Sequence, residues 1–374
     1  MHILQLITKF YRSGAESLVY DISQILVEKG YKVTILALNK NENSLEEDNI
    51  KKNLESKGIK TLCFNSQRTH VQKIRHLVYE IKENHINLIH AHAYHPNKYG
   101  RIASFFSGVP TVVTYHSATN DWVNFRARTL EKILSLSIFK QKRVSVSKIP
   151  LNHYRNKISK NKEVFIIPNG VFVDKYKEEK SLEEVRRSLG LTKSDKMLLN
   201  VGRIVEAKNQ KVLIKALAKL KEKGYRDIHL FIAGLKQNED LFKELLDISQ
   251  KSNLSSNVHF LGSRNDIGNL LQACDVFMFP SLNEAHPIAL IEAAFCGKVI
   301  LASSIEANIN SFSQESVIFL KENHVDHIVE SLENIFNDFN HYSSYGLKAK
   351  SEAENKYNIY KTVEKYENLY SGLL

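Results

Sequence analysis

Cysteine is scarce in this chain of 374 residues, which has only Cys63, Cys274 and Cys296. None of the three stands in a CxxC pair, so the sequence offers no disulfide framework. Each lies among apolar residues, and we interpret all three as small buried side chains of a protein from a reducing compartment. The predicted location is therefore the cytosol.

Long apolar runs are missing as well. No stretch approaches the roughly 18 consecutive apolar residues that a membrane-spanning helix requires. The opening residues MHILQLITKFYRSGAE lack a charged stretch followed by a long apolar one, so we expect a strand entering a loop and no signal peptide. With 43% hydrophobic and 25% charged residues, the composition is that of a soluble globular protein.

Acidic residues are scarce in the front half only. Residues 1–175 carry 27 Lys and Arg against 14 Asp and Glu, whereas the remainder carries 25 against 27. This asymmetry suggests an anionic partner of the front half, such as a membrane surface, a nucleic acid or a phosphorylated ligand. A lysine-rich solvated surface is the alternative, and the charge balance does not decide between them.

The chain does have a regular alternation of short apolar strands and helical segments. Predicted strands are HILQLIT, YKVTILAL, LIHAHA and TVVTYH in front, then KMLLNVGRI, IHLFIAG, NVHFLG, VFMFPS and KVILAS. Such strand–helix–strand repeats form parallel sheets with helices on both faces. We therefore predict an α/β fold of two doubly wound, Rossmann-like domains, at 1–175 and 176–356. A final helix at 357–374 is expected to pack back on the first domain.

The segment FPSLNEAHPIALIEAAFCGK, residues 279–298, carries Glu284 and Glu292 eight positions apart. Pro287 suits the first turn of a helix, so Glu284 precedes the helix and Glu292 lies within it. Both can then face the crevice at the carboxyl ends of the strands, where doubly wound folds bind ligands. The first amides of the helix favour a phosphate, and carboxylates accept protons from hydroxyl groups. This combination describes a nucleotide diphosphate sugar. The alternative is a helix-entry carboxylate and an unrelated surface residue.

The loop NVGRIVEAKNQ, which follows a strand of the same half, adds two cations. Arg203 and Lys208 can meet the same crevice and clamp a diphosphate between them. A solvated basic loop is the alternative interpretation of this segment.

Taken together, GRIVEAKN, IAG, FLG, CDVFMFPSLNEAHPIALIEAAFCGKVI and IIPNGV resemble the motifs of retaining nucleotide-sugar glycosyltransferases of family 4. The resemblance is specific over about 165–305 and weaker in the front half, where it rests on YRSGAE, IHAHA and TYHS. It implies the GT-B fold, in which two Rossmann-like domains face each other across a cleft.

The resemblance also implies a role for each matching residue. Glu284 would contact the donor sugar beside its reacting carbon, and Glu292 would hold the ribose hydroxyls. Arg203 and Lys208 would neutralise the leaving diphosphate, and His116 would reach the donor sugar from the opposite domain. The further donor-binding positions implied are Gly14 in the first-strand loop, Asn169 and Gly170 at the domain junction, Arg264 near the base or diphosphate, and Ala285, His286, Pro287 and Ile288 beside the sugar and phosphate.

Three positions depart from the family pattern. The family usually has glycine after the first glutamate, where this chain has Ala285. The glycine pair of the first loop is reduced to Ser13 and Gly14, and the loop after IAG reads LKQN without a second glycine. The donor geometry near these loops therefore stays open.

The reaction implied is the transfer of a sugar from a nucleotide donor to a hydroxyl group, with retention of the anomeric configuration. Negative charge develops on the leaving phosphate, and Arg203, Lys208 and the helix amides would stabilise it without a metal ion or another cofactor. The family's retaining step needs no separate enzyme nucleophile, so none is assigned. A glycosidase with two catalytic carboxylates fits less well, because it would not need the cations. The prediction is a retaining, metal-independent hexosyltransferase.

The acceptor is suggested only by residues 121–143, DWVNFRARTLEKILSLSIFKQKR, which mix Trp122 and Phe125 with six Lys or Arg against Asp121 and Glu131. The segment could be an amphipathic helix at an anionic membrane surface, or a core-packing helix with a basic outer edge. In the first case the acceptor would be a glycan or glycolipid of surface polysaccharide assembly. The enzyme would then lie peripherally at the inner face of the membrane.

Other interpretations remain open. His90, His92 and His95 could bind a metal ion, but no cysteine or paired carboxylates stand near them, so we predict a histidine cluster and no metal site. A nucleotide-sugar epimerase of the same fold would share the cations and carboxylates but would need no acceptor. A non-catalytic nucleotide-sugar-binding protein is the third possibility. Nucleic acid is not an expected partner, because aromatic residues do not alternate with the basic ones.

Overall fold

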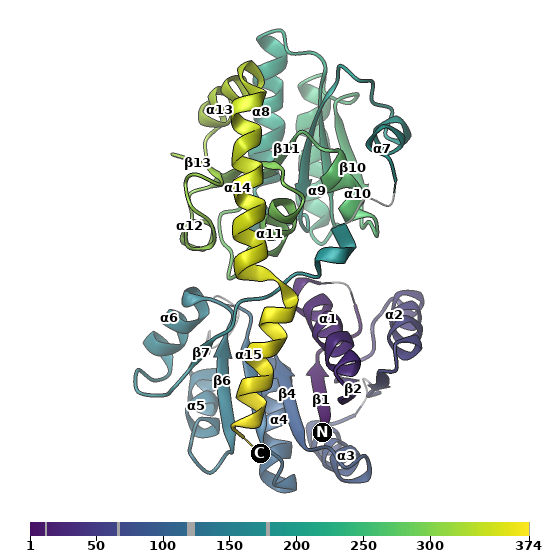
Figure 1. The fold of residues 1–374 in the computed structure, drawn as a ribbon, viewed down its shortest axis with the longest axis vertical. Coiled ribbons are helices and arrows are strands. Elements are labelled where there is room, and N and C mark those ends of the chain that lie inside the picture. Colours follow the sequence, from purple (N-terminus) through teal and green to yellow (C-terminus); the bar gives the residue numbers. More distant parts are fainter. Residues whose placement is uncertain (12, 66–67, 118–123, 177–179, 374) are drawn as a thin grey trace. The chain divides into compact units, whose positions relative to one another are not determined.

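The computed structural model describes residues 1–11, 13–65, 68–117, 124–176 and 180–373. The chain forms two compact units, one of Met1–Gly170 with Ile359–Leu374 and the other of Val171–Asn358. Each unit contains its own parallel sheet with helices around it (Figure 1). The predicted α/β class with two Rossmann-like domains is confirmed.

The first unit is built on a seven-stranded sheet with the order β3-β2-β1-β4-β5-β6-β7. The chain therefore moves from one side of β1 to the other at the β1/β4 pair, and ligands of open α/β sheets bind beside the carboxyl ends of strands at such a switch point. The strands are β1 His2–Ile7, β2 Lys32–Ala37, β3 Lys60–Cys63, β4 Leu88–His92, β5 Thr111–Tyr115, β6 Gln141–Ser145 and β7 Phe165–Ile166. The helices of this unit are α1 Gly14–Glu28, α2 Ser44–Ser56, α3 His70–Glu83, α4 Tyr94–Ser107, α5 Phe125–Leu134, α6 Lys148–Lys157 and α15 Ile359–Ser371.

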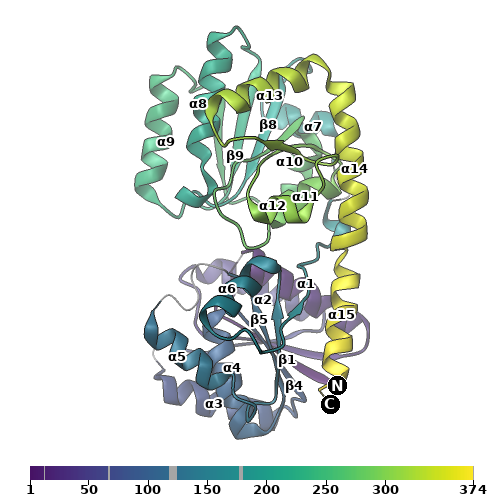
Figure 2. The same cartoon turned by 90° about the vertical axis from the view of Figure 1, so that its left-hand side faces the viewer.

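Strand β4 shows how the two faces of the first sheet differ. Ile89 and Ala91 point to the face covered by α3 and α4, where they join an apolar cluster. His90 and His92 alternate with them and point to the opposite face, where α15 lies beside α1 (Figures 1 and 2). There the Tyr370 hydroxyl of α15 lies 2.7 Å from His90 Nδ1. The C-terminal helix is thus an integral layer of the first unit.

The second unit has a six-stranded sheet with the order β10-β9-β8-β11-β12-β13, so its switch point lies at the β8/β11 pair. The strands are β8 Lys196–Val201, β9 Ile228–Ala233, β10 Val258–Gly262, β11 Val276–Phe279, β12 Val299–Ser303 and β13 Ile318–Leu320. The helices are η1 Val173–Tyr176, α7 Leu182–Ser188, η2 Glu206–Lys208, α8 Gln210–Glu222, α9 Glu239–Lys251, α10 Ile267–Ala273, α11 Ile288–Phe295, α12 Glu306–Ser311, α13 Val325–Asn337 and α14 Phe339–Tyr357.

Two apolar clusters hold the helices on this second sheet. One includes side chains of α8, α9 and α13, and the other includes side chains of α7, α10, α11 and α14. Helix α14 runs beside α11 (Figure 1), and a Cβ atom at Gly346 of α14 would lie only 2.2 Å from the carbonyl oxygen of Gly297. Glycine is therefore required at position 346, and this close approach fixes the helix that carries Glu292.

The glycine of the IAG motif has a comparable structural reason. Gly234 follows β9 with a φ of +156°, and a Cβ atom there would lie 2.0 Å from the carbonyl oxygen of Gly202 after β8. The loops after these two strands are therefore in backbone contact. Because the loop after β8 carries Arg203 and Lys208, Gly234 helps to position both cations.

The segment 121–143 is not one continuous helix. Its helical part is α5, and Gln141 to Arg143 belong to β6, where the buried Arg143 guanidinium donates to the carbonyl oxygen of Ser135. Asp121 and Trp122 lie outside the described residues. Across the described parts of the chain, none of the helices has both the length and the apolar character needed to cross a bilayer.

Candidate functional site

Arg203, Lys208 and Glu284 follow β8 and β11, the neighbouring strands at the switch point of the second sheet. The loop after β8 contains Arg203 and the short helix η2 with Lys208, and the loop after β11 contains Glu284. A backbone hydrogen bond joins the two loops, because the Leu282 N–H donates to the carbonyl oxygen of Ala207 at 2.8 Å. Parallel pairing thus brings these distant segments to one edge of the sheet.

Lys208 and Glu284 form an ion pair at this edge. The ammonium of Lys208 contacts Oε1 of Glu284, and the two side chains are only 17% and 12% exposed. The ammonium also lies 5.3 Å from the ring centroid of Phe279, within the range of a cation–π contact. The stem of Lys208 packs against Gly202, where a Cβ atom would lie 3.3 Å from Lys208 Cδ. The cation is therefore held in place before any ligand binds.

The two predicted arginines have other partners. The Arg203 guanidinium donates to Gln237 Oε1 at 2.7 Å, so its partner is neutral. The Arg264 guanidinium donates to both carboxylate oxygens of Asp266, at 2.8 and 2.6 Å, and this pairing raises the pKa of Arg264. The sequence analysis did not consider Asp266 as a partner, although it stands only two residues away. Arg264 follows β10, two strands away from β8 in the sheet.

Glu292 has a partner that the sequence analysis missed. The hydroxyl of Tyr176 donates to its Oε1 at 2.7 Å. Tyr176 ends η1, and its carbonyl oxygen accepts a hydrogen bond from the Gln272 amide at 2.8 Å. The only signal was the tyrosine of VFVDKY, which stands 116 residues before Glu292. Sequence patterns do not reveal a contact between side chains so far apart.

The segment from Ala285 to Ile288 forms the entry into α11. Ile288 begins the helix, Pro287 is its N-cap residue, and no side chain among the described residues caps this end. The Ile288 N–H donates to the carbonyl oxygen of His286 at 3.0 Å, and the His286 ring packs edge-on against Tyr357 at 5.4 Å. An uncapped helix start carries partial positive charge on its amides, which favours an anion.

The remaining donor-site predictions fall in the first unit. Gly14 begins α1, directly after the N-cap residue Ser13. Gly170 approaches α15 so closely that a Cβ atom would lie 2.6 Å from Ile359 Cα. Packing against α15 therefore requires this glycine, a reason that the sequence did not disclose. Asn169 beside it is buried, and its Oδ1 has no hydrogen-bond partner among the described residues.

His116 follows β5 and joins two histidines of β4 on one face of the first sheet. Its Nε2 lies 3.2 Å from His92 Nδ1, and the ring centroids of His90 and His92 are 4.0 Å apart. Burial lowers the pKa of His116 to about 4 and the pKa values of His90 and His92 well below their usual range, because an imidazolium would lose its hydration in the interior. All three rings are therefore neutral at pH 7.

The histidine cluster differs from the one considered as a metal site. The structure joins His116 to His90 and His92, whereas His95 lies in α4. In the parts of the chain that the structure describes, no group of three or more His, Cys, Asp or Glu side chains is arranged to hold a metal ion.

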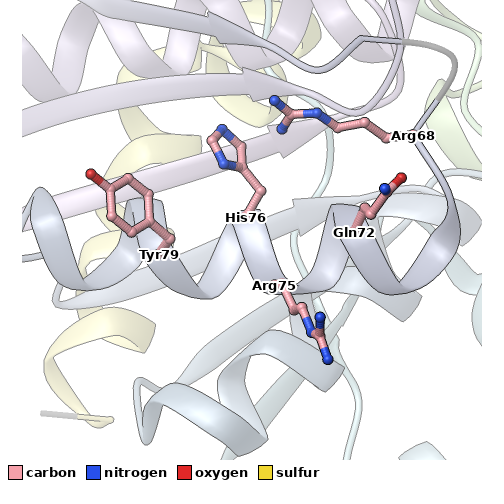
Figure 3. A pocket seen from close by; sticks show the side chains of 5 residues that line it. All are labelled: Arg68, Gln72, Arg75, His76 and Tyr79. Carbon is pink, nitrogen blue, oxygen red and sulfur yellow. The ribbon is translucent and has the colours of Figure 1, made fainter.

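A separate hollow lies on the surface of the first unit, at α3 and the segment before it. Figure 3 shows His76 and Tyr79 on one side of the helix and Arg75 pointing to the other. The Arg68 guanidinium lies 5.4 Å from the ring centroid of Phe64, and Arg68 also lines this hollow. None of its lining residues, which are Arg68, Gln72, Arg75, His76 and Tyr79, was predicted as a site residue.

Two protein-family models match the chain. The model described as Glycosyltransferase Family 4 matches residues 12–175, and the model described as Glycosyl transferases group 1 matches residues 181–352. The first match covers the first unit from residue 12 up to Gly170 and the first five residues of the second unit, and the second match lies within the second unit. Together the two matches span most of the sequence.

Named relatives and a solved structure agree with these matches. The chain is 26% identical over 329 residues to UDP-Gal:alpha-D-GlcNAc-diphosphoundecaprenol alpha-1,3-galactosyltransferase of Escherichia coli, covering 84% of this chain and 83% of the relative. It is 24% identical over 287 residues to N,N'-diacetylbacillosaminyl-diphospho-undecaprenol alpha-1,3-N-acetylgalactosaminyltransferase of Campylobacter jejuni, covering 71% and 73%. The fold matches that of Anabaena HepE in complex with UDP-glucose, with a TM-score of 0.87 at 20% identity and full coverage of both chains.

Both halves of the chain thus match glycosyltransferase models, and both sheets have the topology of GT-B enzymes. The resemblance found in the sequence motifs is confirmed at the level of the family. The chain belongs to the group 1 and family 4 glycosyltransferases.

Proposed function

We propose that this glycosyltransferase moves a sugar from a nucleotide diphosphate sugar to a hydroxyl group of a lipid-linked glycan, with retention of the anomeric configuration. The observation that carries the proposal is the Lys208–Glu284 ion pair at the β8/β11 switch point. A cation suits a diphosphate, and a carboxylate suits the hydroxyls of a sugar. Lys208 and Glu284 are in contact with each other. Their spacing therefore suits a donor in which the phosphate is bonded directly to the sugar.

The same ion pair indicates what changes when the donor binds. The diphosphate takes over Lys208, and sugar hydroxyls replace the ammonium as partners of Glu284. When the bond between the sugar carbon and the phosphate oxygen breaks, negative charge grows on that oxygen, and Lys208 stabilises it. Arg203 adds a second cation from the same loop, since its neutral partner Gln237 is exchanged at little cost. These groups supply the positive charge, so we assign no metal ion to the reaction.

A UDP-sugar is the first donor to test. The Escherichia coli relative is named for UDP-galactose, and HepE was solved with UDP-glucose. Thermal unfolding of the full chain with UDP-, GDP- and ADP-sugars would identify the base, because a ligand at 100 times its Kd adds about 2.7 kcal/mol to stability. We expect the largest rise in Tm with one of the UDP-sugars.

The acceptor proposal rests on the names of both relatives, which specify diphosphoundecaprenol acceptors, and on the first unit's surface. Between positions 84 and 162 the chain has 13 Lys and Arg, and its only acidic residues there are Asp121 and Glu131. Arg101 and Glu131 pair with each other in the interior, so neither contributes to the surface charge. Large apolar side chains are exposed in the same stretch, namely Phe105, Phe106, Phe125, Ile133 and Ile138. We expect this basic and apolar surface to bind an anionic membrane at its inner, cytoplasmic face.

Product analysis tests the reaction directly. The full chain is incubated with a UDP-sugar and a polyprenyl-diphosphate glycan, with and without EDTA, and the anomeric configuration of the product is read by NMR. We expect transfer with the donor's configuration kept and the rate unchanged by EDTA. Inversion at the anomeric carbon would refute retention. Interconversion of the free nucleotide sugar without acceptor would show an epimerase instead.

Vesicle flotation tests the membrane surface. We expect the chain to float with vesicles that contain anionic lipid and to stay behind with neutral vesicles. The double variant Phe105→Ser/Phe106→Ser should reduce flotation, whereas Leu45→Ser, which changes an even more exposed apolar side chain of α2, should not. Equal recovery of all three proteins with both kinds of vesicle would contradict the membrane proposal and leave the transfer reaction untouched.

A further inference from the structure

Gln5, His92 and His116 form a hydrogen-bonded line across three neighbouring strands of the first sheet. Gln5 Oε1 lies 2.8 Å from His92 Nε2, and His92 Nδ1 lies 3.2 Å from His116 Nε2. Strand register explains the line, because His92 pairs with Thr114, and His116 stands two residues further along on the same face. We call these three side chains the Gln5–His92–His116 line.

The hydrogen-bonding capacity of each atom fixes where the protons lie. The oxygen of the Gln5 amide can only accept, so His92 carries its proton on Nε2. Burial keeps His92 neutral by lowering its pKa, and its Nδ1 is therefore a bare acceptor. His116 must then donate from Nε2. Since burial also keeps the His116 ring neutral, its Nδ1 is the bare nitrogen.

This bare nitrogen has nothing to bind within the described residues. Nδ1 of His116 is buried and has no hydrogen-bond partner there. A buried acceptor without a partner is unfavourable, and native structures rarely leave one unless a ligand or water completes it. A neutral nitrogen with a free lone pair can accept from a hydroxyl or an N–H group, and it repels a phosphate oxygen.

We propose that Gln5 and His92 are positioning residues for the transfer reaction, which fix His116 in its Nε2–H form so that Nδ1 accepts a hydrogen bond from a substrate hydroxyl. This inference rests on the proposed function, because the hydroxyl belongs to the sugar substrate. It assigns a purpose to Gln5, which no motif of the sequence distinguishes, and to His92, which the sequence suggested only as part of a histidine cluster. Neither residue touches the substrate, and each acts through His116.

His90 provides a matched comparison within the same cluster. Its Nδ1 lies 2.7 Å from the Tyr370 hydroxyl and its Nε2 lies 2.8 Å from Thr114 Oγ1. Both partners are hydroxyl groups, which can donate or accept, so this branch fixes no tautomer. Thr114→Val removes the hydrogen bond to His90 and a longer one, at 3.4 Å, to the Tyr366 hydroxyl, and it leaves the Gln5–His92–His116 line intact.

The experiment combines spectroscopy and kinetics on the full chain. In protein labelled with 15N-histidine, the shifts of the ring nitrogens distinguish a protonated from a bare nitrogen, and His116→Gln assigns the signals of position 116. We expect the wild type and Thr114→Val to show the Nε2–H form of His116. Gln5→Met, which keeps the side-chain length without the acceptor, should give a mixture of both forms. Its kcat/KM should fall about tenfold, which corresponds to one lost hydrogen bond, while that of Thr114→Val stays near the wild type.

The outcomes separate this inference from the proposed function. A proton on Nδ1 of His116 in the wild type would overturn the assignment, because the Gln5 amide would then face the other way. An unchanged tautomer and an unchanged kcat/KM in Gln5→Met would show that Gln5 is not a positioning residue. If the wild type shows the Nε2–H form but transfers no sugar, the proposed function is wrong and the positioning role is lost with it. Equal Tm values of Gln5→Met and Thr114→Val exclude loss of folding as the cause.

Discussion

The carboxyl edges of the two sheets differ in charge although the strand orders around the two switch points are the same. The edge of the second sheet carries Lys208 and Glu284 as a partly exposed ion pair, and an uncapped helix start follows it. The edge of the first sheet carries His92 and His116, which burial keeps neutral. The second edge is therefore suited to the charged diphosphate of a donor, and the first edge is suited to uncharged hydroxyl groups.

The comparison extends to the charges that each unit keeps inside. Within its described residues, the first unit buries one complete ion pair, Arg101 with Glu131, whose side chains are 1% and 2% exposed. Both guanidinium nitrogens donate to this carboxylate, at 2.9 and 2.6 Å, and the Tyr115 hydroxyl adds a third bond at 2.9 Å. These charges join α4 to α5 and cannot reach a ligand. The ion pair of the first unit is thus enclosed in the interior, whereas Lys208 and Glu284 of the second unit lie partly exposed at the edge of its sheet.

The largest expected effect tests the structural ion pair. Glu131→Gln leaves the Arg101 charge buried without its counterion, and we expect the free energy of unfolding to fall by about 3–5 kcal/mol. Urea denaturation followed by circular dichroism measures this loss. Glu333→Gln, which breaks the exposed pair with Lys223, is the control and should cost about 1 kcal/mol or less. Equal losses in both variants would mean that the buried pair has no special role.

The next effect tests the charged edge of the second unit. Lys208→Ala removes the cation to which we assign the leaving phosphate, and we expect kcat to fall roughly 100-fold or more, the usual effect of one preorganised donor. Lys211→Ala on α8, which breaks a surface pair with Glu244 of α9, should leave kcat within a few-fold of wild type. Initial rates at saturating donor give both numbers. A Lys208→Ala enzyme as active as the control would refute the assigned role of the pair.

The last comparison, whose effect depends on how far the pH is lowered, distinguishes the two edges by pH. In the folded chain, burial lowers the pKa of His116 to about 4 and the pKa values of His90 and His92 well below their usual range. The unfolded chain binds protons near pH 6.5, so the stability of the first unit is complete above that value. It should fall as the pH drops from about 6.5 towards 4, by up to about 1.4 kcal/mol per pH unit for each histidine.

Hydrogen exchange measured by mass spectrometry at pH 7.5 and 5.5 tests this pH dependence region by region. We expect faster exchange at pH 5.5 in peptides from β4 and β5, after correction for the intrinsic pH dependence, and a smaller change in peptides from β8 and β11. His116→Gln should reduce the difference. The same corrected change in both sheets would show that the buried histidines do not set the acid sensitivity.

The sequence predicted those features that depend on neighbours along the chain. Alternating apolar runs predicted both parallel sheets, because strand and helix periodicities are local properties. The motifs around Arg203, Lys208 and Glu284 predicted the edge of the second sheet, since parallel strands place all their carboxyl ends together. The helix predicted over 121–143 was too long. The last residues of this segment carry no local signal that separates the end of a helix from the beginning of β6.

Contacts between distant side chains were beyond the sequence. Tyr176 meets Glu292 only because η1 folds onto α11, and Gln5 reaches His92 only because β1 and β4 are neighbours in the sheet. The histidine cluster was predicted with His95, yet the partner in space is His116, because β4 and β5 pair side by side. Gly170 was interpreted as part of the donor site, whereas its approach to α15 also requires glycine for packing.

The sequence by itself determined the family, the α/β class and the residue types available for binding a diphosphate and a sugar. Tertiary structure decided which partners hold those residues, which of them are buried and which side chains His116 meets. The physical reason is that chemistry and periodicity are carried by the chain itself. Burial and hydrogen-bond geometry exist only where strand register and helix packing bring distant residues together.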